Sequence, residues 1–367
     1  MTRISKWIIS ALAIVATVSL AFAVGCDYSE DGKPEEIKWK TTDTLWFAAS
    51  GSTFIAPLLN RWGSDYEKTH KVHLNYQSIG SGGGIKNLRQ GTGAFAASDA
   101  PLSDADLKGM PEILQIPVTA GPVSVIYNLP GLMTPLRLSG KTLASIFGGD
   151  IISWQDPAIV RDNPGLKLPH AAIIVVHRSD GSGTTAIFTN YLSKVSPEWL
   201  SKYGNGLTVP WPTGIGGDGS SVVLSTVKQT AGTIGYLELS YAKLAGLPVA
   251  SIQNKAGEYV APTTASAYLA VNASTEILAR DVRTQIVDPP ATAKGAYPIT
   301  GLSFILIPKD NTHGRGEQQA LRDLIAYSLT NGQDVAEEMS YSKLPPPVQQ
   351  EGLAVMAQLT ENGKPTK

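Results

Sequence analysis

Apolar and polar positions divide the start of the folded chain into short segments of two kinds. Leu45 to Ala49 is a short apolar run, and Val72 to Tyr76 alternates apolar with polar residues, as strands do. Between them, large apolar residues recur at every fourth position from Phe54 to Tyr66, which is the period of an amphipathic helix. The pattern therefore predicts a strand, a helix and a second strand in this order.

The same kinds of segment recur to the end of the chain. Runs rich in β-branched residues predict buried strands at 123–127 and 173–176, and another buried strand is expected at 302–307. In the first half of the chain, helices are expected from Ile85 after the glycine run 80–84, after a capping box of Ser103 and Asp106, and over 184–192. Near the end of the chain, helices are expected over 316–330, with Gly332 closing its end, and over 348–359 after Pro345 to Pro347. This alternation predicts an α/β fold with mostly parallel sheets.

The first residues have the pattern of a secretory signal. Arg3 and Lys6 precede an uncharged apolar run over 7–24, so residues 1–25 are expected to be a signal peptide. Residues 21–23 fit ordinary cleavage, whereas 23–26 resemble a bacterial lipobox that carries Ala23 where Leu is usual. A run of this length is also near what a retained membrane anchor needs.

Cys26 favours the lipobox over the ordinary cleavage site. It is the only cysteine of the chain, and a free thiol is a liability in an oxidising compartment. We therefore expect Cys26 to be the lipidated mature N-terminus, followed by a polar tether over 26–41 and a folded part from Thr42. The rival prediction is an ordinary signal peptide with a chance cysteine.

Composition narrows the class of protein. The chain has 367 residues, of which 43% are hydrophobic, so its length suggests two domains or one large one and it is not disordered as a whole. Its 36 glycines and 24 prolines predict many tight turns. Removing residues 1–25 takes away two positive charges and leaves 28 basic against 31 acidic residues, a net charge of -3. This balance argues against a nucleic-acid partner.

The most informative segment is 173–185, where a buried strand, a Gly/Ser turn and a helix follow one another. This order directs free backbone N–H groups and the positive end of a helix dipole at one place. Ser182 and Thr184 add hydroxyl groups, and Arg178 adds a planar donor that suits phosphate or carboxylate. Asp180 is placed to hold the guanidinium. The alternative is an ordinary helix cap after a flexible turn.

Two further segments, 49–54 and 79–84, also place hydroxyl-bearing turns before helices. Neither is a nucleotide-binding loop, because the P-loop motif is absent and Ile85 stands where a dinucleotide fingerprint needs glycine. The expected ligand is therefore a small free anion. Asp99 lies at the end of an apolar segment before Pro101, where a turn or cap residue is the commoner interpretation.

Enzyme motifs are missing from the sequence. It contains no G-x-S-x-G elbow and no H-E-x-x-H motif, and we expect neither a metal nor a cofactor. His70, His73, His170 and His313 are expected at the surface, and His177 is expected as a strand-end residue beside the site. A secreted phosphate-ester hydrolase remains the rival class, because such an enzyme also needs an anion cradle.

Several ordered motifs together resemble a known family, the periplasmic phosphate-binding proteins of bacterial ABC-type phosphate transporters. The resemblance runs from Phe47 to Leu344. It rests on the segments 51–54, 79–83, 97–104, 178–184, 234–236, 298–300 and 304–306. It implies a type II periplasmic-binding-protein fold, with two α/β lobes joined by a hinge of two strand crossovers. Lobe I would take 42–121 and 302–362, and lobe II would take 122–301.

The resemblance also assigns roles to individual residues. It implies that phosphate accepts hydrogen bonds from Thr53, Phe54, Ser81, Arg178, Ser182, Gly183 and Thr184. Asp180 would brace Arg178, and Asp99 would accept the proton of the bound phosphate. Ser52 stands where alanine is familiar and Ile55 where proline is, so the local turn departs from the family pattern.

The family context extends to partners and location. It implies a non-enzymatic, periplasmic or extracytoplasmic protein that delivers inorganic phosphate to transmembrane permease subunits. A monomer is expected, tied to the membrane through Cys26. A binding protein for another tetrahedral oxyanion is the alternative within this class.

Overall fold

The computed structural model describes residues 44–132, 134–311 and 317–366. The predicted signal peptide, the tether, Cys26 and His313 lie outside these residues. Within the described part, no helix is both long enough and apolar enough to cross a membrane.

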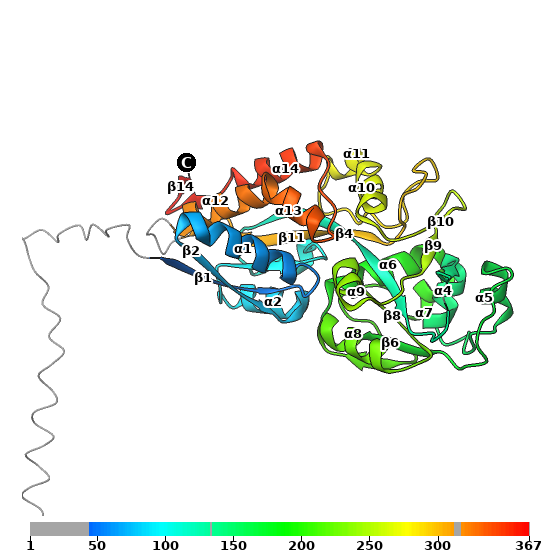
Figure 1. The fold of residues 1–367 in the computed structure, drawn as a ribbon. Coiled ribbons are helices and arrows are strands. Elements are labelled where there is room, and N and C mark those ends of the chain that lie inside the picture. Colours follow the sequence, from blue (N-terminus) through cyan, green and yellow to red (C-terminus); the bar gives the residue numbers. More distant parts are fainter. Residues whose placement is uncertain (1–43, 133, 312–316, 367) are drawn as a thin grey trace, which may run out of the picture. The chain divides into compact units, whose positions relative to one another are not determined.

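An eight-stranded sheet organises the chain from Thr44 onward, with the strand order β2-β1-β3-β11-β4-β8-β6-β7 (Figure 1). Its strands are β1 (Leu45–Gly51), β2 (Val72–Ser78), β3 (Phe95–Ser98), β4 (Ile113–Tyr127), β6 (Ile174–Arg178), β7 (Ile215–Gly217), β8 (Thr233–Glu238) and β11 (Thr300–Pro308). Two small sheets contain β5 (Arg137–Leu138), β9 (Ser251–Gln253) and β10 (Tyr259–Val260), and β12 (Asp310–Asn311), β13 (Thr360–Glu361) and β14 (Lys364–Pro365).

Helices cover this sheet and fill its connections. The helices that precede β4 or follow β11 in the sequence are α1 (Ala56–His70), α2 (Gly80–Arg89), α3 (Asp104–Leu107), α12 (Glu317–Leu329), α13 (Gly332–Glu338) and α14 (Pro346–Met356). The helices between β4 and β11 in the sequence are α4 (Gly140–Phe147), α5 (Pro157–Asp162), α6 (Gly183–Val195), α7 (Pro197–Lys202), α8 (Gly219–Gln229), α9 (Leu239–Ala245), α10 (Thr264–Asn272) and α11 (Thr275–Leu278). Strands and helices alternate as predicted, so the α/β class is confirmed.

The sheet is mixed, which corrects the expectation of mostly parallel strands. At each end of the sheet, neighbouring strands are parallel: β1 pairs with β2 and β3 at one end, and β6 pairs with β7 and β8 at the other. In the middle, β11 and β4 run antiparallel to each other and to their outer neighbours. The chain passes between the two parallel half-sheets along these long strands in opposite directions, and opposite directions give antiparallel pairing.

The strand β4 is the longest of the described strands, with 15 residues that are all buried. Its first part pairs with β11, from Ile113 to Pro122, and its last part pairs with β8, from Val123 to Tyr127. The predicted strand 123–127 is therefore only the end of a longer one. Together with β11, the strand β4 joins the first half-sheet, which consists of β2, β1 and β3, to the second, which consists of β8, β6 and β7.

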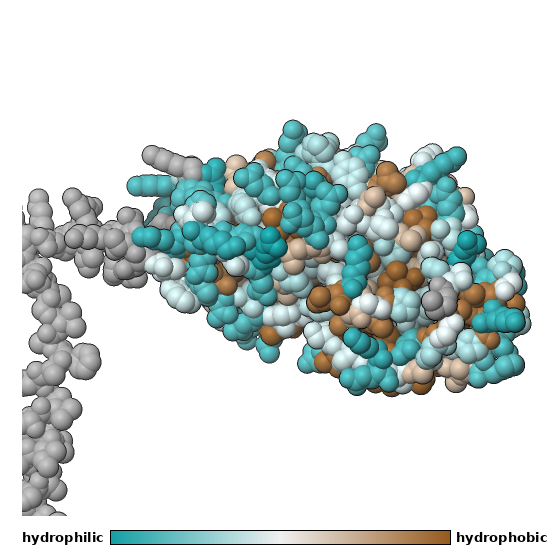
Figure 2. All heavy atoms as spheres, in the orientation of Figure 1, coloured by the Kyte–Doolittle hydropathy of each residue, from teal (hydrophilic) through white to brown (hydrophobic). Residues whose placement is uncertain are grey.

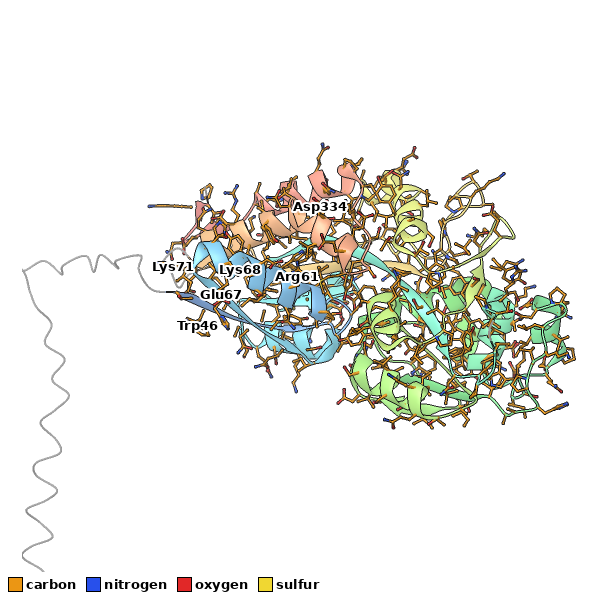
Figure 3. All side chains as sticks on the ribbon, viewed as in Figure 1. Trp46, Arg61, Glu67, Lys68, Lys71 and Asp334 are labelled. Carbon is orange, nitrogen blue, oxygen red and sulfur yellow. The ribbon has the colours of Figure 1, made fainter. Side chains whose placement is uncertain are left out.

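Most predicted elements are confirmed, with shifted boundaries. The helix expected over 54–66 begins at Ala56 and continues to His70. Its buried side includes Leu58 and Trp62, and its outer side carries charged residues, among them Lys68 (Figure 3). The same side is hydrophilic in the space-filling view (Figure 2). The capping box is also confirmed: Ser103 Oγ accepts the Asp106 N–H at 3.2 Å, and Asp106 accepts the Ser103 N–H at 2.9 Å.

Two expected helix ends are wrong. Gly332 does not close α12 but begins α13, and a Cβ there would lie 2.8 Å from Trp62 Nε1. Glycine is required because the Trp62 indole donates to the Gly332 carbonyl at 2.9 Å. Pro346 and Pro347 do not precede the last helix but form its first turn, where a missing N–H costs nothing.

The glycine run 80–84 forms the first turns of α2 and is not a loop before it, which corrects the expected start at Ile85. A Cβ on Gly84 would lie 2.5 Å from Gly51 Cα and 2.7 Å from the Ser50 carbonyl oxygen. Glycine therefore lets α2 lie directly on the backbone of β1, at the point where β1 ends.

This contact gives a test with a matched control. Gly84→Ala should lower the free energy of unfolding by about 1–3 kcal/mol, because backbone atoms cannot move away from the new methyl group. Gly83→Ala adds the same methyl group to the same helix, but meets only the side chain of Ile79, at 3.0 Å. Since alanine favours helix over glycine, Gly83→Ala should cost nothing or stabilise by up to about 1 kcal/mol. Urea denaturation measures both, and equal effects would contradict the close contact with β1.

Candidate functional site

The three hydroxyl-bearing turns meet between the two half-sheets. Arg178, the last residue of β6, donates from Nη1 to Thr53 Oγ1 at 2.9 Å. The Gly183 N–H donates to Ser81 Oγ at 3.1 Å, and the Gly82 N–H donates to the Gly181 carbonyl at 2.8 Å. The structure thus brings the turn of 178–184 together with two turns that lie about a hundred residues or more before it in the sequence. The predicted ligand residues that share this buried region are Thr53, Phe54, Ser81, Asp99, Arg178, Ser182, Gly183 and Thr184.

Arg178 is held in one orientation by its neighbours. It is 3% exposed, and Asp180 accepts from both its Nε, at 2.6 Å, and its Nη2. Asp180 also accepts the Gly219 N–H at 3.1 Å. Burial acts to lower the pKa of Arg178, but the bond to Asp180 outweighs it and the pKa is raised. Burial acts to raise the pKa of Asp180, and the guanidinium outweighs it and lowers that pKa. The pair therefore stays ionised, as the predicted bracing role requires.

The start of α6 supplies backbone and hydroxyl donors. Ser182 is its N-cap, and its Oγ accepts the Thr185 N–H at 3.1 Å. Thr184 is 1% exposed, and its Oγ1 has no hydrogen-bond partner among the described residues. A buried hydroxyl without a partner is costly, so a ligand that accepts from Thr184 would relieve that cost. The helix dipole favours a negatively charged ligand at the same place.

Gly183 lies where no side chain fits. A Cβ there would be 2.5 Å from Ser81 Oγ and 2.6 Å from Asp99 Oδ2. The backbone of α6 therefore approaches both residues directly, so the segment that follows β6 contacts the segments that follow β2 and β3.

Asp99 is a member of this cluster rather than an exposed turn residue. It is 2% exposed, and its two oxygens accept from Ser52 Oγ at 2.6 Å and from Ser303 Oγ at 2.7 Å. Burial raises its pKa to about 6, while the two serine hydroxyls and Arg178 act to lower it. Asp99 is thus ionised at neutral pH and accepts a proton in mildly acidic solution.

Ser52, noted as a departure from the family pattern, links two predicted ligand residues. Its Oγ donates to Asp99 and accepts the Phe54 N–H at 3.0 Å. The Phe54 N–H, expected to donate to the anion, therefore donates to Ser52 in this structure. Tyr341 fixes the same turn by donating to the Phe54 carbonyl at 2.6 Å.

Four residues that belong to this hydrogen-bonded cluster were not predicted from the sequence as part of the site: Ser52, Ser303, Ser220 and Glu238. Ser220 Oγ lies 2.8 Å from Thr53 Oγ1 and accepts from Arg178 at 3.2 Å. Glu238, the last residue of β8, is 1% exposed, and its Oε2 lies 3.2 Å from Ser220 Oγ. The only local signal for Glu238 was its place two residues after the 234–236 motif, whereas Ser220 and Ser303 had no signal.

Among the described residues, His70, His73 and His177 make other contacts than those of this cluster. His177 is half-buried and stacks on Trp211 with ring centroids 4.8 Å apart, beside Arg178. His70 stacks on Tyr66, and His73 contacts Glu67 at 3.0 Å. Within the part of the chain that the structure describes, no group of three or more His, Cys, Asp or Glu residues is arranged to hold a metal ion.

The fold and this donor-rich site define a class of solute-binding proteins. Residues 36–331 match a family model described as a PBP superfamily domain, which confirms the expected periplasmic-binding-protein fold. Phosphate-binding protein PstS of Xylella fastidiosa (strain Temecula1) is 43% identical over 306 residues, 83% of this chain and 83% of that protein. The protein of the same name from Methanocaldococcus jannaschii is 38% identical over 354 residues, 90% of this chain and 89% of its own. The chain belongs to the PstS family of phosphate-binding proteins.

A solved structure supports the same fold. The periplasmic phosphate-binding protein PfluDING, determined with bound phosphate, superposes with a TM-score of 0.67 at 20% identity, covering 85% of this chain and 93% of that one.

Proposed function

We propose that this protein is the solute-binding component of an ABC-type phosphate transporter, which captures inorganic phosphate and delivers it to transmembrane permease subunits. The observation that carries the proposal is the meeting of many neutral donors, an arginine braced by Asp180 and the buried carboxyl group of Asp99 in a single cluster. Relatives named phosphate-binding protein PstS over most of the chain support it.

In this proposal the anion is held mainly by neutral groups that are already in place. The residues assigned to it as donors are Thr53, Phe54, Ser81, Arg178, Ser182, Gly183 and Thr184. Preorganised backbone and hydroxyl donors need little rearrangement when the anion enters, so a single cation suffices. The Thr184 hydroxyl supports this assignment, because no group in the described part of the chain hydrogen-bonds to it. The Phe54 N–H would leave Ser52 when phosphate arrives.

We also infer a division into two lobes, with 42–121 and 302–362 in lobe I and 122–301 in lobe II. The support is that β4 and β11 are the strands along which the chain passes between the half-sheets. Contacts such as Arg178 to Thr53 and Gly82 to Gly181 would break if the lobes moved apart. A hinge at the two crossing strands would then open and close the site.

One titration tests the proposal. Apo protein should bind inorganic phosphate, and its affinity for sulfate and for a phosphate monoester should be lower by roughly tenfold or more. The reason is that neither anion can donate a proton to Asp99 while its other oxygens accept from the same set of donors. Equal or tighter binding of sulfate would indicate a binding protein for another oxyanion. Release of phosphate from the monoester would indicate the hydrolase.

We further propose an extracytoplasmic location for a monomer held to the membrane by a lipid on Cys26. The signal-like pattern of residues 1–25 and the single cysteine support this arrangement. Several acyl chains are needed for stable anchoring, since one gives only marginal membrane binding. Mass spectrometry of the N-terminal peptide from cells tests it: an acylated Cys26 is expected, and an unmodified N-terminus at Val24 would contradict it.

A further inference from the structure

Glu238 is a second buried carboxyl group beside the proposed phosphate site. Its Oε2 lies 3.2 Å from Ser220 Oγ, and its Oε1 has no hydrogen-bond partner among the described residues. An ionised carboxylate here would add negative charge to a site that already contains Asp99 and receives an anion. The roles implied by the resemblance leave Glu238 without a function.

The surroundings of Glu238 keep it neutral. Burial raises its pKa well above the ordinary value and Asp99 acts to raise it further, whereas its own backbone, Arg178 and Ser220 act to lower it without outweighing burial. The other titratable groups that face it are the phenols of Tyr241 and Tyr341, and neither carries a charge to stabilise an ionised form. Bound phosphate would disfavour the ionised carboxyl further.

A chain of hydroxyl groups connects Glu238 to the site. Ser220 Oγ is 2.8 Å from Thr53 Oγ1, and Arg178 Nη1 donates to both oxygens, at 3.2 Å and 2.9 Å. Arginine can only donate, so it occupies one lone pair on each oxygen. Each hydroxyl has a single proton. The direction of both protons therefore depends on whether Glu238 offers a donor or an acceptor.

We propose that Glu238 is a positioning residue that carries a proton: its O–H donates to Ser220, Ser220 donates to Thr53, and the Thr53 hydroxyl is thereby turned toward the anion. This inference rests on the proposed phosphate function. In this arrangement every lone pair and proton of the two hydroxyls has a partner once the anion is bound. An ionised Glu238 reverses the chain: Ser220 donates to Glu238, Thr53 donates to Ser220, and Thr53 presents a lone pair to the anion.

The test compares variants that keep or remove the donor. Glu238→Gln cannot ionise and still offers an N–H, so it should bind phosphate within about threefold of wild type. Glu238→Met removes the donor at similar size and should weaken binding by roughly tenfold, the effect of losing one hydrogen bond to an anion. Ser220→Ala interrupts the chain and should cause a similar loss. Both substitutions act through Thr53, so their effects should not add. The phosphate dissociation constant of the double variant Ser220→Ala/Glu238→Met should therefore exceed that of the weaker-binding single variant by at most about threefold.

These affinities are measured by titration calorimetry with inorganic phosphate. Wild-type affinity in Glu238→Met or Ser220→Ala, a loss in Glu238→Gln equal to that in Glu238→Met, or additive losses in the double variant would each overturn the inference. Failure of the wild type itself to bind phosphate would instead overturn the proposed function.

Infrared spectroscopy provides a measurement that does not depend on the methionine variant folding. In the wild type at about pH 8, Asp99 and the exposed carboxyl groups are ionised. A band of a protonated carboxyl group is expected there, and it should disappear when Glu238→Gln is added. Absence of any such difference would show that Glu238 is ionised and would overturn the inference.

Discussion

Replacing Arg178 with alanine should weaken phosphate binding by at least tenfold. A hydrogen bond to a charged partner contributes about 1.5–3 kcal/mol, which corresponds to roughly a 10- to 150-fold change in affinity. Arg178 has five N–H donors, of which four are engaged with Asp180, Thr53 and Ser220. The remaining N–H on Nη2 and the buried positive charge are what an anion would use.

Part of the loss should come from Asp180 rather than from Arg178. Without the guanidinium, Asp180 becomes an uncompensated carboxylate whose side chain is only 13% exposed, close to the anion. The double variant Arg178→Ala/Asp180→Asn should therefore bind phosphate more tightly than Arg178→Ala alone. Calorimetric titration measures both, with a thermal melt to establish folding.

A surface arginine provides the control. Arg61 lies on the outer face of α1 (Figure 3) and forms an ion pair with Asp65, so Arg61→Ala removes an arginine and an ion pair away from the site. Its phosphate affinity should equal that of the wild type. A folded Arg178→Ala protein that binds within threefold of wild type would remove Arg178 from the site.

The site was predictable where the signal was local. A strand, a small-residue turn and a helix are adjacent in sequence, so residues 173–185 could be interpreted as an anion cradle without knowledge of the fold. The backbone geometry that creates the donors is set by the same few residues. The structure adds that the turns at Thr53, Ser81 and Arg178 contact one another.

The site was not predictable where contacts join distant segments. Ser303 reaches Asp99 only because β11 pairs with β3, and Ser220 reaches Thr53 across 167 positions. The same reason explains the error at Gly332, whose need for glycine comes from Trp62, 270 positions away. The antiparallel centre of the sheet likewise depends on how the two halves join, and no local pattern encodes it.

Asp99 shows how burial changes the meaning of a residue. Its local sequence favoured a turn residue, and only the family resemblance suggested a role in binding. The structure surrounds it with two serine donors and raises its pKa to about 6, which is the behaviour of an acceptor kept ionised at neutral pH. Hydrogen phosphate can donate a proton to such an acceptor, whereas sulfate has none to donate.

Replacing Asp99 with asparagine should therefore relax the rejection of sulfate more than it damages phosphate binding. Sulfate oxygens facing an ionised Asp99 are repelled, and a buried acceptor without its donor costs about 1–3 kcal/mol. Asparagine offers an N–H that either anion accepts. The ratio of the sulfate to the phosphate dissociation constant should fall by roughly tenfold or more. Ser52→Ala, which removes a neighbour of Asp99 but keeps the carboxylate, is the control and should retain most of the ratio.

The pKa of Asp99 gives this prediction a pH dependence with a definite sign. Above about pH 6 the carboxyl is ionised and repels sulfate; as the pH falls through that value it gains a proton and becomes a donor. Sulfate binding by the wild type should therefore strengthen as the pH falls, by at most about tenfold per pH unit, since one proton is taken up. Asp99→Asn cannot titrate, so its sulfate affinity should lack this component. If both proteins show the same pH profile and the same sulfate-to-phosphate ratio, Asp99 does not discriminate between the anions and serves only to hold the turns of Ser52 and Ser303 together.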